Sequence, residues 1–172
     1  MKNINSLKSR LSSNNILLVQ NENGHLCYAG FEWRSPATDT EISKFEKANK
    51  IMLPDDYKEF LKTSNGATLF KDIEYGQWGC VLYGLDELIE KSKQVKNAYG
   101  DLFKESWLVF AEWLGDGDLF IFDLEKVSNN EKKYLLYGGG CDSPADYRYL
   151  RNFEIWLDRL IVAQGAKYWL WF

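Results

Sequence analysis

The sequence predicts a single α+β domain in which an antiparallel-rich β-sheet packs against helices. Three observations predict it. The 172 residues are enough to bury a substantial core. Turn signals at Asn23-Gly24 and at Gly115–Asp118 each lie between apolar runs, which is typical of β-hairpins. A pair of helices between Thr38 and Gly66 then interrupts any repeating βαβ scheme. We therefore expect one domain over residues 1–172.

The pattern of residues 1–33 predicts a short helix followed by a β-hairpin. Strand-like runs at 16–20 and 25–33 flank the Asn21–Gly24 turn, and Asn and Gly both tolerate positive φ. The helix before them is indicated by apolar residues at helical spacing, which are Ile4, Leu7 and Leu11.

Residues 38–70 give the most consistent local signals. Thr38 and Glu41 have the spacing of a capping box. Pro54 suits the first position of a second helix, because its missing N–H removes no helical hydrogen bond there. Asn65-Gly66 supplies the left-handed residues that end a helix. The apolar positions of the two helices are Ile42, Phe45, Ala48, Tyr57, Phe60 and Leu61.

The middle of the chain continues the alternation of strands and helices. Thr68–Phe70 predicts a strand, Lys71–Gly79 an exposed loop, and Cys80–Tyr83 a buried strand. A helical stripe begins at Leu85, with Asp86-Glu87 in its first turn, where the helix dipole favours anions.

The second half predicts another hairpin and a closing helix. Trp107–Ala111 and Leu119–Asp123 form the hairpin, Tyr134–Tyr137 is a further strand, and an irregular loop occupies Gly138–Tyr147. Asn152 caps the last helix. Its apolar face consists of Phe153, Trp156, Leu157, Leu160 and Ile161.

The tail that follows Gly165 is too apolar to extend into water. It ends Trp169-Leu170-Trp171-Phe172, and we expect this patch either to pack on the chain itself or to form a homodimer contact. Aromatic residues make up 16% of the chain. Some of these rings could instead lie on a partner-binding surface, where Trp and Tyr are favoured.

Four blocks of sequence occur in an order that resembles the SUKH superfamily. The first is L-P-x-x-Y-x-x-F-L followed by N-G, between Leu53 and Gly66. The next three are Leu82–Leu88, the hairpin around Gly115–Asp118, and the F-x-x-W-L of the last helix at 153–157. The resemblance covers residues 38–161. It leaves out the N-terminal helix and hairpin (1–34) and the aromatic tail (166–172).

Composition excludes several classes of function. The net charge of −4 and the pI near 5.1 disfavour a nucleic-acid-binding protein, which would need a basic face. The three cysteines are far apart, which favours reduced thiols over a disulfide framework. Since the sequence shows neither a signal peptide nor a membrane span, we expect a cytoplasmic protein.

We find little support for enzymatic chemistry and expect no cofactor or metal. His25 is the single histidine. The acidic residues around the second hairpin lack the spacing of a calcium loop. Asp123 with Glu131-Lys132-Lys133 imitates a nuclease pattern, although that segment is more typical of a solvated turn. A metal-dependent enzyme therefore stays the weakest alternative.

The resemblance implies an immunity protein that binds and blocks a toxin domain, such as a basic nuclease, by steric occlusion. The alternative is a non-enzymatic regulatory or scaffold module, as the superfamily's fungal Smi/Knr cell-wall regulators imply. From exposure and residue type, we expect the partner to contact two loops. The candidate residues are Glu74, Tyr75 and Trp78 in the first loop, and Glu112, Asp116 and Asp118 at the second hairpin.

Overall fold

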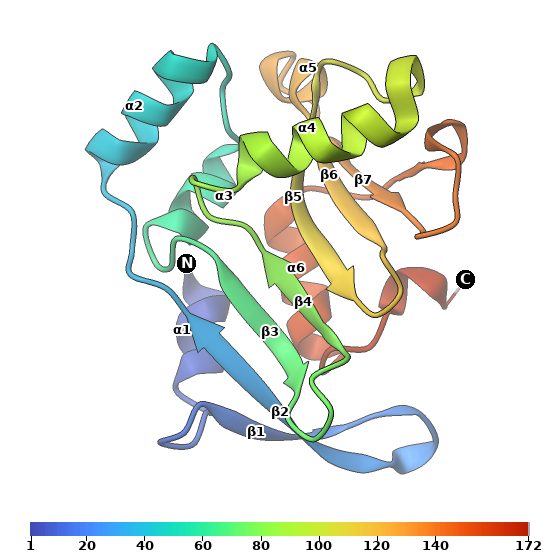
Figure 1. The fold of residues 1–172 in the computed structure, drawn as a ribbon. Helices are drawn as coiled ribbons and strands as arrows, with labels where there is room; N and C mark the ends of the chain where they lie inside the picture. The colour runs from blue at the N-terminus through green and yellow to red at the C-terminus, as the bar shows by residue number, and fades with distance from the viewer. Residues whose placement is uncertain (172) are drawn as a thin grey trace.

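The eight strands of the sheet follow one another in sequence order, and every neighbouring pair is antiparallel (Figure 1). The structure is a computed structural model and describes residues 1–171. The strands within those residues are β1 (Ile16–Gln20), β2 (Leu26–Trp33), β3 (Ala67–Asp72), β4 (Gly79–Leu82), β5 (Trp107–Leu114), β6 (Leu119–Asp123), β7 (Leu135–Gly138) and β8 (Arg148–Tyr149).

Helices connect and cover these strands. The α-helices of the described chain are α1 (Lys2–Lys8), α2 (Asp39–Asn49), α3 (Asp55–Leu61), α4 (Leu88–Tyr99), α5 (Leu124–Ser128) and α6 (Phe153–Val162). Short 3-10 turns occur at Glu22–Gly24, Gly100–Leu102, Pro144–Asp146 and Tyr168–Leu170. The predicted α+β architecture with an antiparallel sheet is confirmed.

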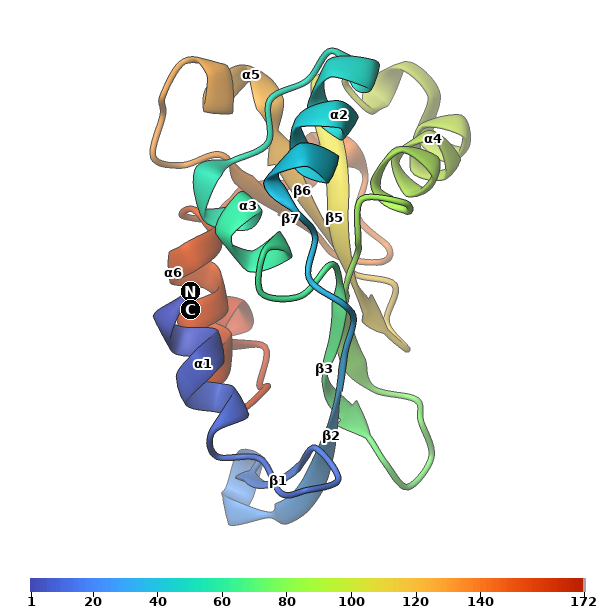
Figure 2. The same ribbon diagram turned by 90° about the vertical axis from the view of Figure 1, so that its left-hand side faces the viewer.

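The two faces of the sheet are covered unequally. Helices α1, α3 and α6 pack on one face, which we call the inner face (Figure 2). Helix α4 crosses the opposite, outer face, where Ser92 Oγ accepts a hydrogen bond from Val109 N of β5 at 2.8 Å. Within residues 1–171, no helix covers the outer side of β1, β2 and β3 (Figure 2). The sheet is therefore closed on one side and partly open on the other.

Aromatic rings fill the space between the inner face and the helices. Phe110 and Phe122 stack at a centroid distance of 4.0 Å, and Tyr57 of α3 meets Phe122 edge-on at 4.9 Å. Phe153 and Trp156 of α6 contact the same cluster, each edge-on to Phe110. All five side chains are fully buried. The residues that mark the SUKH resemblance in α3 and α6 thus form the centre of the core.

The turn after α3 meets the turn before α4 at close range. Gly66 has φ +96°, and a Cβ placed on it would lie 2.9 Å from Gly84 N. Asn65 Oδ1 accepts a hydrogen bond from Leu85 N at 2.9 Å. The prediction that Asn65-Gly66 ends the helix is wrong, because α3 ends at Leu61 and its cap, Lys62, is right-handed. Gly66 instead takes its positive φ in the turn that follows, and the close contact with Gly84 explains why glycine occupies position 66.

Several predicted boundaries are confirmed, and others are corrected. The Thr38–Glu41 capping box is present, with both of its backbone hydrogen bonds. Pro54, however, is the residue that caps α3, one position before the helix begins. Helix α4 begins at Leu88, so Asp86-Glu87 precede it. The Glu87 carboxylate accepts a hydrogen bond from Gly84 N and pairs with Arg34, which holds this segment in a turn.

The tail packs partly on the chain's own core. Trp169 is buried against Phe120 and Trp113, at centroid distances of 4.9 and 5.6 Å. Leu170 and Trp171 are exposed, and Phe172 lies outside the described residues. Self-packing is therefore observed for Trp169, whereas a homodimer contact through the tail stays a prediction.

Candidate partner-binding surface

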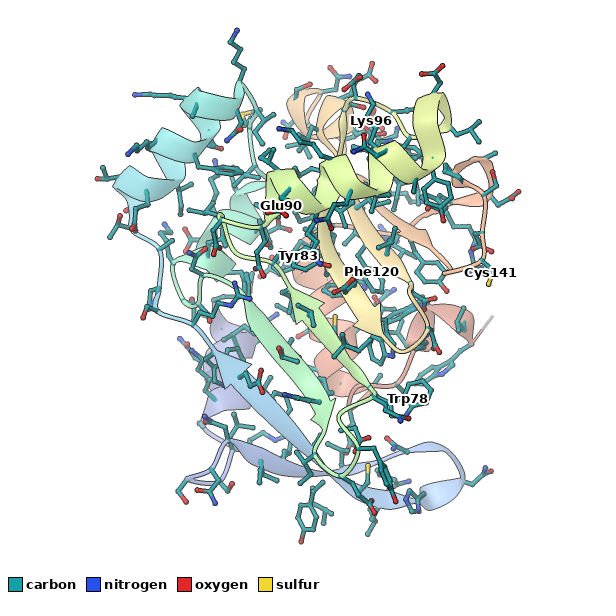
Figure 3. The ribbon with its side chains drawn as sticks, in the orientation of Figure 1. Trp78, Tyr83, Glu90, Lys96, Phe120 and Cys141 are labelled. Atoms are coloured by element: carbon teal, nitrogen blue, oxygen red, sulfur yellow. The ribbon has the colours of Figure 1, made fainter. Side chains whose placement is uncertain are left out.

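The two loops expected to contact a partner lie beside each other. Strands β4 and β5 pair, with Gly79 opposite Leu114, and this pairing aligns the β3–β4 loop with the β5–β6 hairpin. Gly115 of the hairpin has φ +90°, and a Cβ on it would lie 2.9 Å from Gln77 O and 3.4 Å from the Trp78 ring. Figure 3 shows Trp78 at the start of β4, away from α4. The structure therefore brings the two candidate segments together.

A carboxylate fixes the conformation of the β3–β4 loop. Asp72 accepts hydrogen bonds from Glu74 N at 2.9 Å and from Tyr75 N at 3.2 Å, which is the geometry of an Asx-type turn. Tyr75 is 72% exposed and Trp78 is 48% exposed. The adjacent Glu74 carboxylate raises the pKa of the Tyr75 hydroxyl. This loop therefore presents two aromatic rings and a carboxylate to solvent.

The acidic residues of the hairpin are engaged within the chain. Lys167 of the tail pairs with both Asp116 and Asp118, and its Nζ lies 2.6 Å from Asp118 Oδ2. The other oxygen of Asp118 accepts a hydrogen bond from Gly140 N at 3.1 Å. Burial lowers the pKa of Lys167, but the bonds to the two carboxylates outweigh this effect and raise it.

The prediction that Asp118 is exposed is wrong, because only 4% of this residue is accessible to solvent. Its carboxylate ties the hairpin to the tail and to the Gly138–Gly140 loop. Asp116 is exposed but shares the same lysine. We call the contacts of Lys167 with Asp116 and Asp118 the hairpin clamp. The sequence contains no direct sign of it, since Lys167 lies 49 residues away from Asp118.

Glu112 points away from the hairpin clamp, toward α4. It lies on β5 opposite Val81 and Leu119, is half-buried, and its carboxylate is 3.9 Å from Lys91 Nζ of α4. Burial raises the pKa of the neighbouring Tyr83, and Glu112 raises it further. Glu112 therefore contributes a carboxylate to the outer face rather than to the hairpin tip.

The sequence analysis missed an apolar row on the outer face. Leu18 of β1 lies directly opposite Tyr28 of β2, and Ile73 follows β3 beside them, because Asp72 is opposite Ala29. The exposed fractions of these three residues are 49%, 60% and 49%. Strand alternation places Leu18 and Tyr28 on the face opposite to Val19 and Ala29, but it does not say which of the two faces a helix covers.

We call the outer side of β1–β3, with Leu18, Tyr28 and Ile73, the open face. Its flank carries the ion pair between Glu32 and Lys71, at 2.6 Å. Further charged residues lie around it and toward α4. Arg34 pairs with Asp86 and Glu87, Lys91 pairs with Glu112, and Figure 3 shows Glu90 and Lys96 on α4. Most of these charges therefore have a partner of opposite charge within the chain.

A cleft lies elsewhere on the molecule. It lies between α2 and α5 with a volume of about 640 Å³, and its lining combines the apolar Met52 and Leu124 with charged residues. The charged residues are Glu46, Lys47, Lys50, Glu105 and Glu125. None of the six predicted partner-binding residues lines it.

The residues considered for metal chemistry lie apart or have structural partners. Over residues 1–171, no three His, Cys, Asp or Glu side chains come together as a possible metal site. Asp123 is buried, and its Oδ2 accepts a hydrogen bond from Tyr149 OH at 2.6 Å. Glu131 instead pairs with Lys126 at 2.7 Å. Asp123 and Glu131, which form the nuclease-like pattern in the sequence, therefore each make a separate contact within the fold.

None of the helices in the described part of the chain combines the length and the apolar character that crossing a membrane requires.

Comparisons with known proteins agree with the resemblance in the sequence. The family model of the SMI1 / KNR4 family (SUKH-1) matches residues 36–159. The "Uncharacterized protein YobM" of Bacillus subtilis (strain 168) is 31% identical over 175 residues, which cover 99% of this chain and 90% of that protein. The "Uncharacterized protein YnaB" of the same strain is 34% identical over 142 residues, which cover 82% and 88% respectively.

Proposed function

The chain belongs to the SMI1 / KNR4 family (SUKH-1), and from this membership we propose that it is a cytoplasmic immunity protein that binds and neutralises a bacterial toxin domain. The observation that carries the proposal beyond membership is the β3–β4 loop. Tyr75 and Trp78 are exposed on a turn that Asp72 fixes, beside the β5–β6 hairpin. Exposed aromatic side chains held on a rigid turn are typical of binding hot spots.

The mechanism we propose is steric occlusion. The aromatic rings anchor the complex, and the carboxylates of Glu74 and Glu112 speed the encounter with a basic toxin such as a nuclease. Asp116 contributes less, because Lys167 already neutralises it. Asp118 is buried, and its role is to hold the hairpin in place through its ion pair with Lys167.

Co-expression with the toxin domain encoded beside this chain tests the proposal. We expect the wild-type chain to restore growth, and the Tyr75→Ser/Trp78→Ser variant to lose most of that protection. Val162→Ser is the matched control, because Val162 is an exposed apolar residue at the end of α6, on the other side of the sheet.

Cell death in the presence of the folded wild-type chain would contradict the immunity role. A pull-down that returns several endogenous proteins and no toxin would instead favour the regulatory or scaffold module.

A further inference from the structure

The tail reaches the β5–β6 hairpin from outside the part of the chain that matches the family (Figure 1). Lys167 of the tail pairs with Asp116 and Asp118 at the tip of the hairpin. Its Nζ also lies 5.4 Å from the centre of the Trp113 ring on β5. The side chain of Lys167 is only 19% exposed. The tail therefore holds the hairpin from within the fold, where a partner has little access to the lysine.

The hairpin is packed between two neighbouring segments of the sheet. Toward β7, Asp118 Oδ1 accepts a hydrogen bond from Gly140 N at 3.1 Å, and a Cβ on Gly140 would clash with the Asp116 carbonyl oxygen. Toward β4, a Cβ on Gly115 would lie 3.4 Å from the Trp78 ring. The ring therefore rests against the backbone of the hairpin, and a movement of the hairpin would shift the support of Trp78.

We propose that Lys167 is a positioning residue, which keeps the hairpin against Trp78 and so fixes the orientation in which this ring binds the toxin. This inference rests on the immunity function proposed above. Asp116 and Asp118 transmit the effect from the tail to the hairpin. The tail, which no family motif covers, thereby takes part in binding without touching the partner.

The hairpin needs the clamp because its tip is both flexible and acidic. Gly115 and Gly117 have positive φ, and glycine loses more conformational freedom on folding than any other residue. Without Lys167, the two carboxylates that share this cation would repel each other across a short distance. The hairpin would then leave the arrangement that supports Trp78. The ring would have to be ordered at the moment of binding, which weakens affinity.

Fluorine NMR of the chain labelled with 5-fluorotryptophan tests the positioning without any toxin. The Trp78 signal is identified by its loss in Trp78→Phe. We expect Lys167→Met to shift this signal, because the support of the ring moves. Lys167→Arg should restore it, because arginine keeps a cation between the two carboxylates. The exposed Lys132→Met is the matched control and should leave the signal in place. A lysine with a purely structural role would lower stability without shifting the Trp78 signal of the folded chain.

Gly140→Ala reaches the hairpin by a second route, so the test does not depend on the folding of Lys167→Met. Gly140 is exposed in the loop after β7, and the new Cβ would clash with the Asp116 carbonyl oxygen. The hairpin has to move although no charge is lost. We expect the Trp78 signal to shift in this variant as well. An unshifted signal in the folded variants would overturn the positioning role.

Calorimetry with a catalytically inactive form of the toxin domain encoded beside the chain then measures the consequence for binding. We expect Lys167→Met to raise Kd about three- to tenfold, which corresponds to the ordering of one side chain. In the Trp78→Ser background the same change should have no further effect, because the ring through which Lys167 acts is absent.

The outcomes separate this inference from the proposed function. If the wild-type chain does not bind the toxin, the immunity function fails and the binding role of Lys167 fails with it. If the wild-type chain binds and Lys167→Met binds equally well, only the positioning role is overturned. The same conclusion follows if the loss in Lys167→Met simply adds to the loss in Trp78→Ser.

Discussion

The inner and outer faces of one sheet differ in how their aromatic residues are used. On the inner face, Tyr57, Phe110 and Trp156 are fully buried among α1, α3 and α6. On the open face and its neighbouring loop, Tyr28, Tyr75 and Trp78 are largely exposed. The regular sequence motifs supply the buried set, whereas the exposed set comes from segments with little pattern. The motifs therefore mark the scaffold, and the binding surface has to be found from exposure.

Removing a buried ring should have the largest effect on stability. We expect Trp156→Ala to lower the free energy of unfolding by about 3–5 kcal/mol, because it opens a cavity among Phe110, Phe120 and Phe153. Urea denaturation monitored by circular dichroism measures this loss. A loss below about 1 kcal/mol would show that the inner face is not the core that holds the fold together.

The clamp at the hairpin should have the next largest effect. Lys167→Met leaves the buried Asp118 carboxylate without its cation, and we expect a loss of about 2–3 kcal/mol. The exposed Lys132→Met is the matched control and should change stability by less than about 0.5 kcal/mol. Equal values for the two variants in chemical denaturation would argue against a structural role for Asp118.

Removing one buried and one exposed tyrosine hydroxyl tests the same contrast in stability. Tyr57 OH donates a hydrogen bond to the buried Tyr83 carbonyl, so Tyr57→Phe should cost about 1–2 kcal/mol. Tyr75→Phe removes an exposed hydroxyl and should leave the thermal midpoint unchanged. If the two variants had equal midpoints in differential scanning calorimetry, the contrast between the faces would not extend to their polar atoms.

The smallest effect should be a pH-dependent one at the rim of the outer face. Burial raises the pKa of Glu87, but hydrogen bonds from Arg34 and Gly84 outweigh it and lower the pKa below its usual value. A carboxylate with a lowered pKa in the folded state stabilises the fold above its unfolded pKa of about 4.3, and this contribution is lost as the pH falls through the folded pKa.

Glu87→Gln should therefore cost less than about 1 kcal/mol at pH 7, since the partly exposed ion pair is screened by solvent. The difference from the wild type should shrink as the pH falls below about 4.3. A difference that stays constant from pH 7 to pH 3 in urea titrations would mean that the loss comes from packing rather than from charge.

Local signals predicted most of the fold because they depend on neighbours in the chain. The Thr38–Glu41 capping box is such a short-range feature, and it is present. The helix stop expected at Asn65-Gly66 is not where α3 ends, because the helix already ends at Leu61. Helix α5 was missed, since five residues are too few to show a helical stripe, and its cap is Asp123, which also bonds Tyr149. Element boundaries shifted where a long-range contact intervened, as Arg34 does at Glu87.

The candidate site was predictable only in part. The β3–β4 loop was found from its residue types, and Tyr75 and Trp78 are indeed exposed. The hairpin carboxylates could not be judged in the same way, because the environment of Asp118 depends on Lys167 and Gly140. Tyr28 was overlooked, since the sequence does not say which face of the sheet a helix covers.

The sequence by itself determined the family, the antiparallel order of the hairpins and the aromatic core, because caps, turns and apolar spacing act over a few residues. Tertiary structure alone decided which carboxylates reach solvent and which side of the sheet stays open. Both depend on where α4 and the tail pack, and those contacts join residues that are far apart in the chain. Burial is a property of the whole fold, and it separates the structural acid Asp118 from the surface acid Glu74.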